Sequence, residues 1–181
     1  SLWSLDRSVD AITTLMKTFK IPVISGKDSL SSTYRGEDGK VIKIPPVLCM
    51  SVFGKIPDVS KTVSSDFKKL GTSIYLLGKQ DLNSMGGSVF NDIIQSDGGV
   101  VPKANLSLLP KLFNVLHKAI NNGKILSVHD ISEGGLIISL FEMCVGGNLG
   151  ATINVRTKNV QNFLFNETAG TFLVEVEDEK N

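Results

Sequence analysis

The order of strand, loop and helix is clearest in one stretch of this sequence, Val128-His129-Asp130-Ile131-Ser132-Glu133-Gly134-Gly135-Leu136. The apolar run 125–128 predicts a strand that leads into it, and the apolar run 136–145 predicts a helix that follows it. A loop that joins a strand to a helix presents backbone N–H groups and the positive end of the helix dipole. The stretch therefore predicts a mixed α and β domain with a turn that suits anions.

Two side chains of this turn suit a phosphate that is bridged by a metal ion. Asp130 offers one hard carboxylate ligand, and Ser132 offers one hydroxyl donor two residues later. Gly134 and Gly135 carry no side chains, so we expect the backbone to allow close approach of a ligand. The alternative is that Asp130 or Ser132 merely caps the following helix. His129 is more typical of a satisfied histidine at a strand end than of a catalytic base.

A second polar turn follows the apolar segment 21–24, which predicts a short buried strand. In the turn Gly26-Lys27-Asp28-Ser29, Lys27 could neutralise phosphate charge, Asp28 could bind a metal or transfer a proton, and Ser29 is a hydroxyl donor. A phosphate-binding P-loop is excluded because that motif needs Ser or Thr directly after the lysine. A solvated polar turn is the alternative interpretation.

The rest of the chain alternates in the same way. Apolar spacing predicts helices at 5–19 and 108–120 and a short helix through 90–94, with strands at 46–53, 73–77, 151–155 and 171–176. Residues 35–40 are expected to form a polar turn, and Asn122-Gly123 is a typical helix stop. The segment 54–71 has no sustained apolar period, which predicts a connector between two units.

Composition limits the class of protein. With 41% hydrophobic and 20% charged residues, the chain is expected to be globular and soluble. Nineteen Lys and Arg balance eighteen Asp and Glu, which argues against nucleic acid or an anionic membrane as a partner. The apolar runs are too short to cross a bilayer, so we expect a cytoplasmic protein. Cys49 and Cys144 lie in apolar surroundings without CxxC spacing and are expected to be reduced core cysteines.

Taken together, three stretches resemble the family of phosphoribosylformylglycinamidine synthases in its large form. They are 21–31, 128–136 and the sequence Leu164-Phe165-Asn166-Glu167-Thr168. The stretch around Asp130 marks a superfamily shared with aminoimidazole ribonucleotide synthetase, selenophosphate synthetase and thiamine-monophosphate kinase. The stretch Gly26-Lys27-Asp28-Ser29 points to the second synthetase-like half of this synthase.

The resemblance implies an α+β fold. A mixed α/β C-terminal domain of the aminoimidazole ribonucleotide synthetase type would be preceded by the end of a sheet-forming N-terminal domain. We expect the end of that N-terminal domain at 1–57, a connector at 58–70 and a truncated C-terminal domain at 71–181.

The resemblance also implies an activity. The family converts formylglycinamide ribonucleotide to formylglycinamidine ribonucleotide in purine biosynthesis, as a ligase that uses ATP and glutamine-derived ammonia. It implies ATP or ADP and Mg²⁺ as cofactors, with the metal at Asp130. Nucleotide or substrate binding is implied for Ser132 and for Gly26, Lys27, Asp28 and Ser29. No residue is assigned a catalytic role, and the Asp130 site is expected to be auxiliary and structural.

The implied partners are the first synthetase-like half and the glutaminase domain of the same enzyme. Because neither is contained in this chain, we expect a fragment that is inactive alone. Two alternatives stay open: a nucleotide-binding half that serves only as a scaffold, and another enzyme of the superfamily, such as a selenophosphate synthetase.

Overall fold

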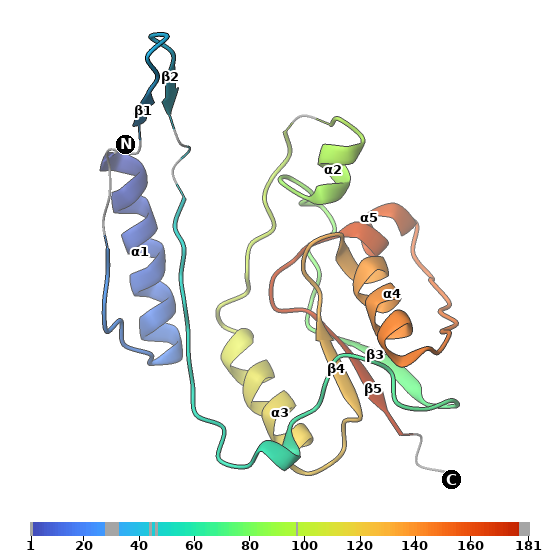
Figure 1. Cartoon of the computed structure of the whole chain (residues 1–181). Helices are drawn as coiled ribbons and strands as arrows, with labels where there is room; N and C mark the ends of the chain where they lie inside the picture. The colour runs from blue at the N-terminus through green and yellow to red at the C-terminus, as the bar shows by residue number, and fades with distance from the viewer. Residues whose placement is uncertain (1, 28–32, 44, 46, 97, 178–181) are drawn as a thin grey trace. The chain divides into compact units, whose positions relative to one another are not determined.

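The computed structural model of the chain describes residues 2–27, 33–43, 45, 47–96 and 98–177. Two compact units, Ser1–Ile56 and Pro57–Asn181, make up the chain (Figure 1). Helices and strands mix in the order expected of an α+β fold, which confirms the predicted class. Among the described residues, no helix has both the length and the apolar character that a membrane span requires.

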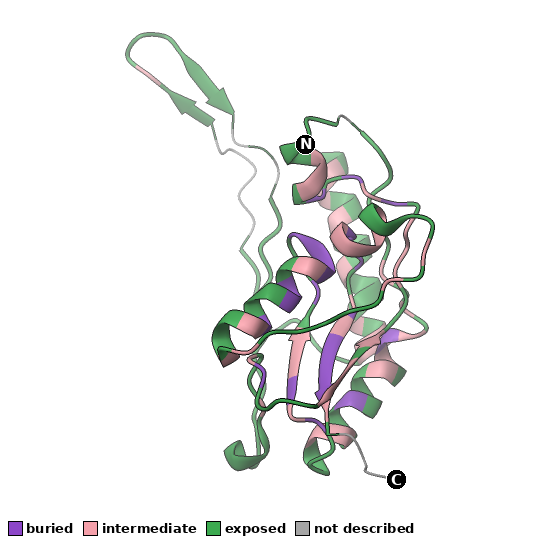
Figure 2. Cartoon of the chain, turned by 90° about the vertical axis from the view of Figure 1, so that its right-hand side faces the viewer, coloured by how far each residue is buried: buried purple, intermediate pink, exposed green. Residues whose placement is uncertain are grey.

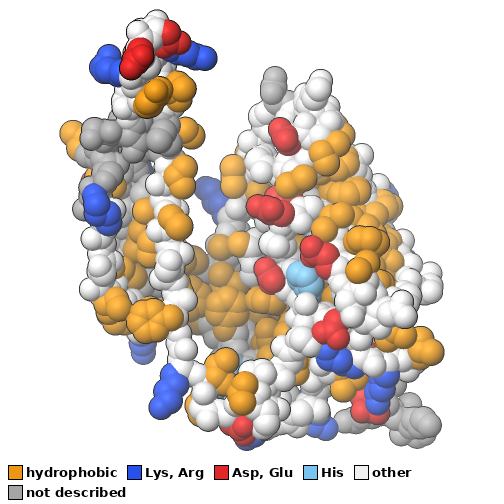
Figure 3. Space-filling view, in the orientation of Figure 1, with side chains coloured by type: hydrophobic (Ala, Val, Ile, Leu, Met, Phe, Trp, Pro, Cys, Tyr) orange, Lys and Arg blue, Asp and Glu red, His pale blue; other side chains and the backbone are white. Residues whose placement is uncertain are grey.

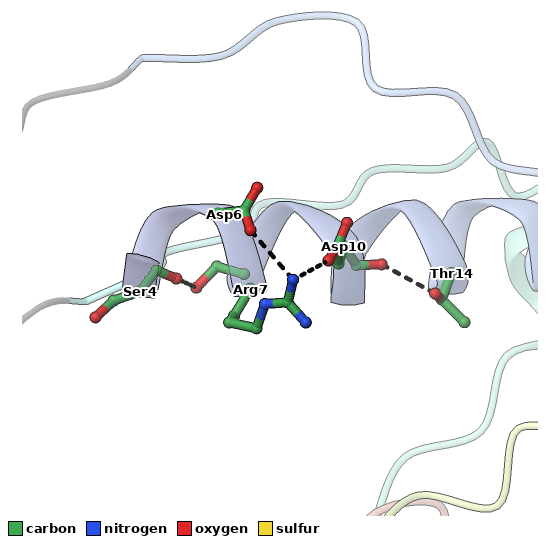
Figure 4. A network of polar contacts seen from close by, with 6 residues as sticks. Ser4, Asp6, Arg7, Asp10 and Thr14 are labelled. Atoms are coloured by element: carbon green, nitrogen blue, oxygen red, sulfur yellow. Dashed lines mark hydrogen bonds and ion pairs between the residues drawn. The ribbon is translucent and has the colours of Figure 1, made fainter. Parts of the chain in front are cut away.

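The first unit contains helix α1 (Leu2–Phe19), close to the predicted bounds, and a hairpin of β1 (Thr33–Arg35) and β2 (Val41–Lys43). Polar contacts run along one side of α1 (Figure 4). Arg7 lies 3.2 Å from the carboxylates of both Asp6 and Asp10. Such exposed pairs contribute only a few tenths of a kcal/mol each, so the two pairs together stabilise the helix by about 0.5 kcal/mol.

The hairpin surrounds the predicted polar turn. Tyr34 pairs with Ile42 at its centre, and the turn closes through a 2.9 Å hydrogen bond from the Gly36 N–H to the Lys40 carbonyl. Gly39 has a φ of +76°, a conformation that glycine adopts without steric penalty. The turn was predicted, but its flanking strands were not, because each is only three residues long.

No described residue of the first unit is buried (Figure 2). The predicted strands at 21–24 and 46–53 are wrong for this structure: residues 21–24 and 47–53 form no strand and are exposed. Apolar runs of this kind become strands only when a neighbouring strand shares their backbone hydrogen bonds. Cys49 is exposed as well, which corrects its prediction as a core cysteine.

The second unit is built around a three-stranded antiparallel sheet in the order β3-β5-β4. The strands are β3 (Ser73–Leu77), β4 (Ser127–Asp130) and β5 (Phe172–Val176). Helix α4 (Gly135–Gly147) packs on the face that carries Leu173, and α3 (Leu109–Asn121) packs on the face that carries Val174. Because successive side chains of β5 point to opposite faces, this central strand contributes to both cores.

Short elements complete this unit: a 3-10 turn η1 (Val59–Lys61), α2 (Val89–Ile93) and α5 (Val160–Phe165). The predicted stop of α3 is confirmed, since Gly123 has a φ of +67° and donates to the Ile120 carbonyl.

Helix α4 ends where Gly147 passes so close to the Phe67 backbone that a Cβ would lie 2.3 Å from the Phe67 oxygen. Residues 58–70 thus pack onto the second unit; the predicted domain limits stay a prediction.

The predicted strand at 151–155 is wrong. These residues form no strand, although they line the same cavity of about 620 Å³ as β3. Phe67, Leu140 and Leu173 close its inner side. Cys144 is half-buried against the core on the α4 side, in agreement with its prediction.

Candidate functional site

The turn between β4 and α4 leaves the side chains of Asp130 and Ser132 exposed at the end of the strand. The Asp130 side chain is 68% exposed. Neither residue caps the helix, because the N-cap of α4 is Gly134, which has no side chain that could accept a capping hydrogen bond. Ser132 contributes only its carbonyl, which accepts the Gly135 N–H at 3.1 Å. The alternative that these side chains serve as caps is therefore wrong.

His129 is held on both sides of its ring. Its Nδ1 lies 2.7 Å from the Asp130 carbonyl oxygen, and its Nε2 lies 3.1 Å from Glu142 Oε2 on α4. The side chain is only 15% exposed. The ring thus ties the end of β4 to α4, which fits the interpretation as a satisfied histidine at a strand end.

The two glycines of the turn are explained by the chain itself. Gly134 and Gly135 have φ values of +81° and +76°, which disfavour any residue with a Cβ. A Cβ at Gly135 would lie 2.5 Å from the backbone of Phe165. The close approach expected for a ligand at Gly135 is therefore made by the last turn of α5, at Leu164 and Phe165.

The residues that follow α5 place Glu167 at the start of two other helices. Its Oε1 accepts the backbone N–H of Gly134 at 2.8 Å and that of Val89, the first residue of α2, at 2.9 Å. The sequence did not predict this role, because the two hydrogen bonds join Glu167 to residues that lie 33 and 78 positions earlier in the chain.

The neighbours of Glu167 anchor it. Asn166 is fully buried and donates to the carbonyls of Asp81 and Ser84 at 2.8 and 2.9 Å. Thr168, also buried, accepts the Asp81 N–H at 2.9 Å through its hydroxyl. Residues 166–168 therefore form a polar clasp, which holds the loop before α2 and the start of α4 in one arrangement.

The second predicted turn lies in the first unit. Gly26 and Lys27 are exposed and belong to no helix or strand. A Cβ at Gly26 would meet nothing within 4 Å. Asp28 and Ser29 lie outside the described residues.

The carboxylate of Asp130 is the ligand that the turn between β4 and α4 would offer to Mg²⁺. The described residues contain no group of three His, Cys, Asp or Glu side chains that would hold a metal by themselves. Mg²⁺ commonly binds through one or two carboxylates together with phosphate oxygens and water, and the exposed carboxylate of Asp130 fits that mode. The carboxylates of Asp130 and Glu142 lie 3.7 and 3.1 Å from the ring of His129. Figure 3 shows acidic side chains near a histidine of the second unit, and such charge favours a cation over a bare anion.

Known proteins match most of the chain. The model of the family "AIR synthase related protein, C-terminal domain" matches residues 69–181. The phosphoribosylformylglycinamidine synthase subunit PurL of Caldanaerobacter subterraneus is 36% identical over 98% of this chain. The subunit of the same name from Prochlorococcus marinus is 35% identical over 91% of it. The chain spans only 24% and 22% of the lengths of these curated relatives.

A solved structure supports the fold. The PurL of T. maritima, complexed with FGAR, superposes with a TM-score of 0.54 over 67% of this chain and 22% of its own. Only 16% of the residues are identical, so this likeness concerns the fold alone.

Proposed function

The chain belongs to the AIR synthase-related family through its C-terminal domain, and from this we propose that it is part of a phosphoribosylformylglycinamidine synthase. The parent enzyme would join ammonia from glutamine to formylglycinamide ribonucleotide in purine biosynthesis, at the expense of ATP. The observation that carries the proposal is the match of 98% of the chain to a synthase subunit at 36% identity. The cytoplasm stays the predicted location.

We assign two roles within that enzyme. Asp130 and Ser132 would bind an auxiliary nucleotide, with Mg²⁺ at Asp130 and a hydrogen bond to phosphate from Ser132. Two observations support these roles: both side chains are exposed at the end of a strand, and neither of them caps α4. Bound Mg²⁺ would neutralise phosphate charge at this acidic turn. Gly26, Lys27, Asp28 and Ser29 would contribute to the active site shared with the first half.

The chain alone is proposed to be inactive, because the relatives are about four times as long. The missing partners would be the first synthetase-like half and the glutaminase domain. Exposed hydrophobic side chains support a large protein partner: Val52 and Phe53 are 76% and 83% exposed, and Phe141 on the outer side of α4 is 62% exposed.

Calorimetry with Mg-ADP tests the nucleotide site. The 181-residue chain should release binding heat, and Asp130→Ala should weaken binding at least about tenfold through loss of a metal ligand. Asp92→Ala removes another exposed carboxylate of this unit and should leave binding unchanged. Heat that Asp130→Ala does not alter would refute the metal assignment.

An activity assay tests the proposed enzyme. Formylglycinamide ribonucleotide, ATP and ammonia should give no amidine with the chain alone, and amidine should form once the remaining parts of the synthase are added. Turnover by the chain alone would contradict a shared active site. If the reconstituted enzyme forms selenophosphate instead, the assignment to this synthase is wrong.

A further inference from the structure

We propose that Glu167 is a positioning residue of the nucleotide site. Its carboxylate holds Gly134, at the end of the turn between β4 and α4, and makes nucleotide binding depend on a metal ion. This inference rests on the proposed function of Asp130 and Ser132. Glu167 lies 33 positions after Gly134, the residue whose N–H group it accepts.

One oxygen of Glu167 accepts both the Gly134 N–H and the Val89 N–H, at 2.8 and 2.9 Å. Gly134 is the N-cap of α4 and lies four residues after Asp130. The same carboxylate therefore fixes where the turn ends, and with it the backbone that carries Asp130 and Ser132.

Glu167 lies between two buried residues that are held by hydrogen bonds. The side chains on either side, Asn166 and Thr168, are 0% and 2% exposed and are bonded to the loop at Asp81. Gly135 is pressed against the backbone of Phe165. Glu167 therefore has little room to move away when a ligand arrives.

The negative charge of Glu167 changes what the start of α4 attracts. The N-terminus of a helix attracts anions because of its dipole and its unpaired N–H groups. Here a carboxylate already takes one of these N–H groups and opposes the dipole with a negative charge. A bare phosphate is thereby disfavoured, while a phosphate that arrives with a divalent cation is not.

Three variants separate these effects. Glu167→Gln keeps an oxygen that can accept the two N–H groups but removes the charge. Glu167→Ala removes both. Glu133→Gln is the matched control, because it removes one exposed negative charge from the same turn without touching the clasp. The probes are ADP with EDTA, ADP with Mg²⁺, and inorganic phosphate, each measured by calorimetry.

Glu167→Gln should strengthen binding of metal-free ADP about two- to fivefold, the effect of one charge at a helix end, while Mg-ADP binding changes less. Glu167→Ala should weaken Mg-ADP binding and speed hydrogen exchange at the Gly134 and Val89 amides together. A merely structural role would lower thermal stability without changing the ratio of the two ADP affinities.

The outcomes are distinct. If the wild-type chain binds no nucleotide, the site at Asp130 fails and this inference fails with it. If the wild type binds Mg-ADP but Glu167→Gln keeps the same dependence on Mg²⁺, only the role of Glu167 is refuted. The same refutation follows if Glu133→Gln reproduces the effect, since the charge of the turn in general would then be responsible.

Discussion

The carboxylate of Glu175 and the hydroxyl of Ser127 are 2.8 Å apart, on paired strands, and both residues are fully buried. Glu175 also accepts the backbone N–H groups of Lys68 and Lys69 at 2.9 and 3.3 Å, and the Thr72 hydroxyl at 2.9 Å. Four donors thus surround one buried carboxylate. This arrangement anchors the segment before β3 to the central strand.

Replacing Glu175 with Gln should lower the free energy of unfolding by about 2–4 kcal/mol, because an amide NH₂ would face donors it cannot accept from. Urea unfolding at neutral pH measures this change. Glu177→Gln is the control: its ion pair with Lys69 is exposed, so the change should stay within about 0.5 kcal/mol. Equal stability of the two variants would show that the buried bonds are unimportant.

Sequence patterns predicted those elements whose stability is local. The apolar spacing of α1 and α3 and the glycine stop at Gly123 depend on nearby residues, and these predictions are confirmed. Strands need a partner that the sequence does not identify. For that reason 73–77 is a strand, whereas 151–155, which was also predicted as a strand, is not.

The same distinction between local and long-range interactions holds for the residues of the candidate site. Asp130 and Ser132 were identified because they are close in sequence to a strand end. Glu167 and Glu175 act across long separations, so no spacing rule found them. A charge within the apolar run 171–176 was the one available signal for Glu175, because a buried strand carries a carboxylate only when it is well bonded.

Gly135→Ala should destabilise the chain by at least about 2 kcal/mol without any ligand present, because of its positive φ and the contact with Phe165. Gly150→Ala should be nearly neutral, since a Cβ there meets nothing within 4 Å. Thermal or urea unfolding of both variants compares them directly. A neutral Gly135→Ala combined with lost nucleotide binding would restore the ligand explanation of this glycine.

At low pH the interaction of Asp66 with Lys68 and Ser64 should weaken. A hydrogen bond from Lys68, at 2.7 Å, and another from Ser64 lower the pKa of Asp66 from 3.8 to about 2. Since the pKa is lowered in the folded state, its stabilisation is present above pH 3.8 and is lost as the pH falls towards 2.

The measurement for Asp66 is the difference in unfolding free energy between the wild type and Asp66→Asn as a function of pH. The difference should be constant near neutral pH and should shrink between about pH 4 and pH 2. In a Lys68→Met background the pH dependence of this difference should largely disappear. A difference that stays constant down to pH 2 would contradict the lowered pKa.

Two phenylalanines, one in the core and one on the surface, test whether the exposed apolar residues of the first unit bind the proposed partner. Phe67 is 5% exposed and Phe53 is 83% exposed. Phe67→Ala should lower the free energy of unfolding by about 3–5 kcal/mol through loss of core packing, whereas Phe53→Ala should change it by less than about 0.5 kcal/mol. Phe53→Ala should instead reduce self-association of the chain in sedimentation and weaken its assembly with the remaining parts of the synthase. If Phe53→Ala leaves both association and assembly unchanged, this part of the first unit is not a partner surface, and the apolar run 47–53 needs another explanation.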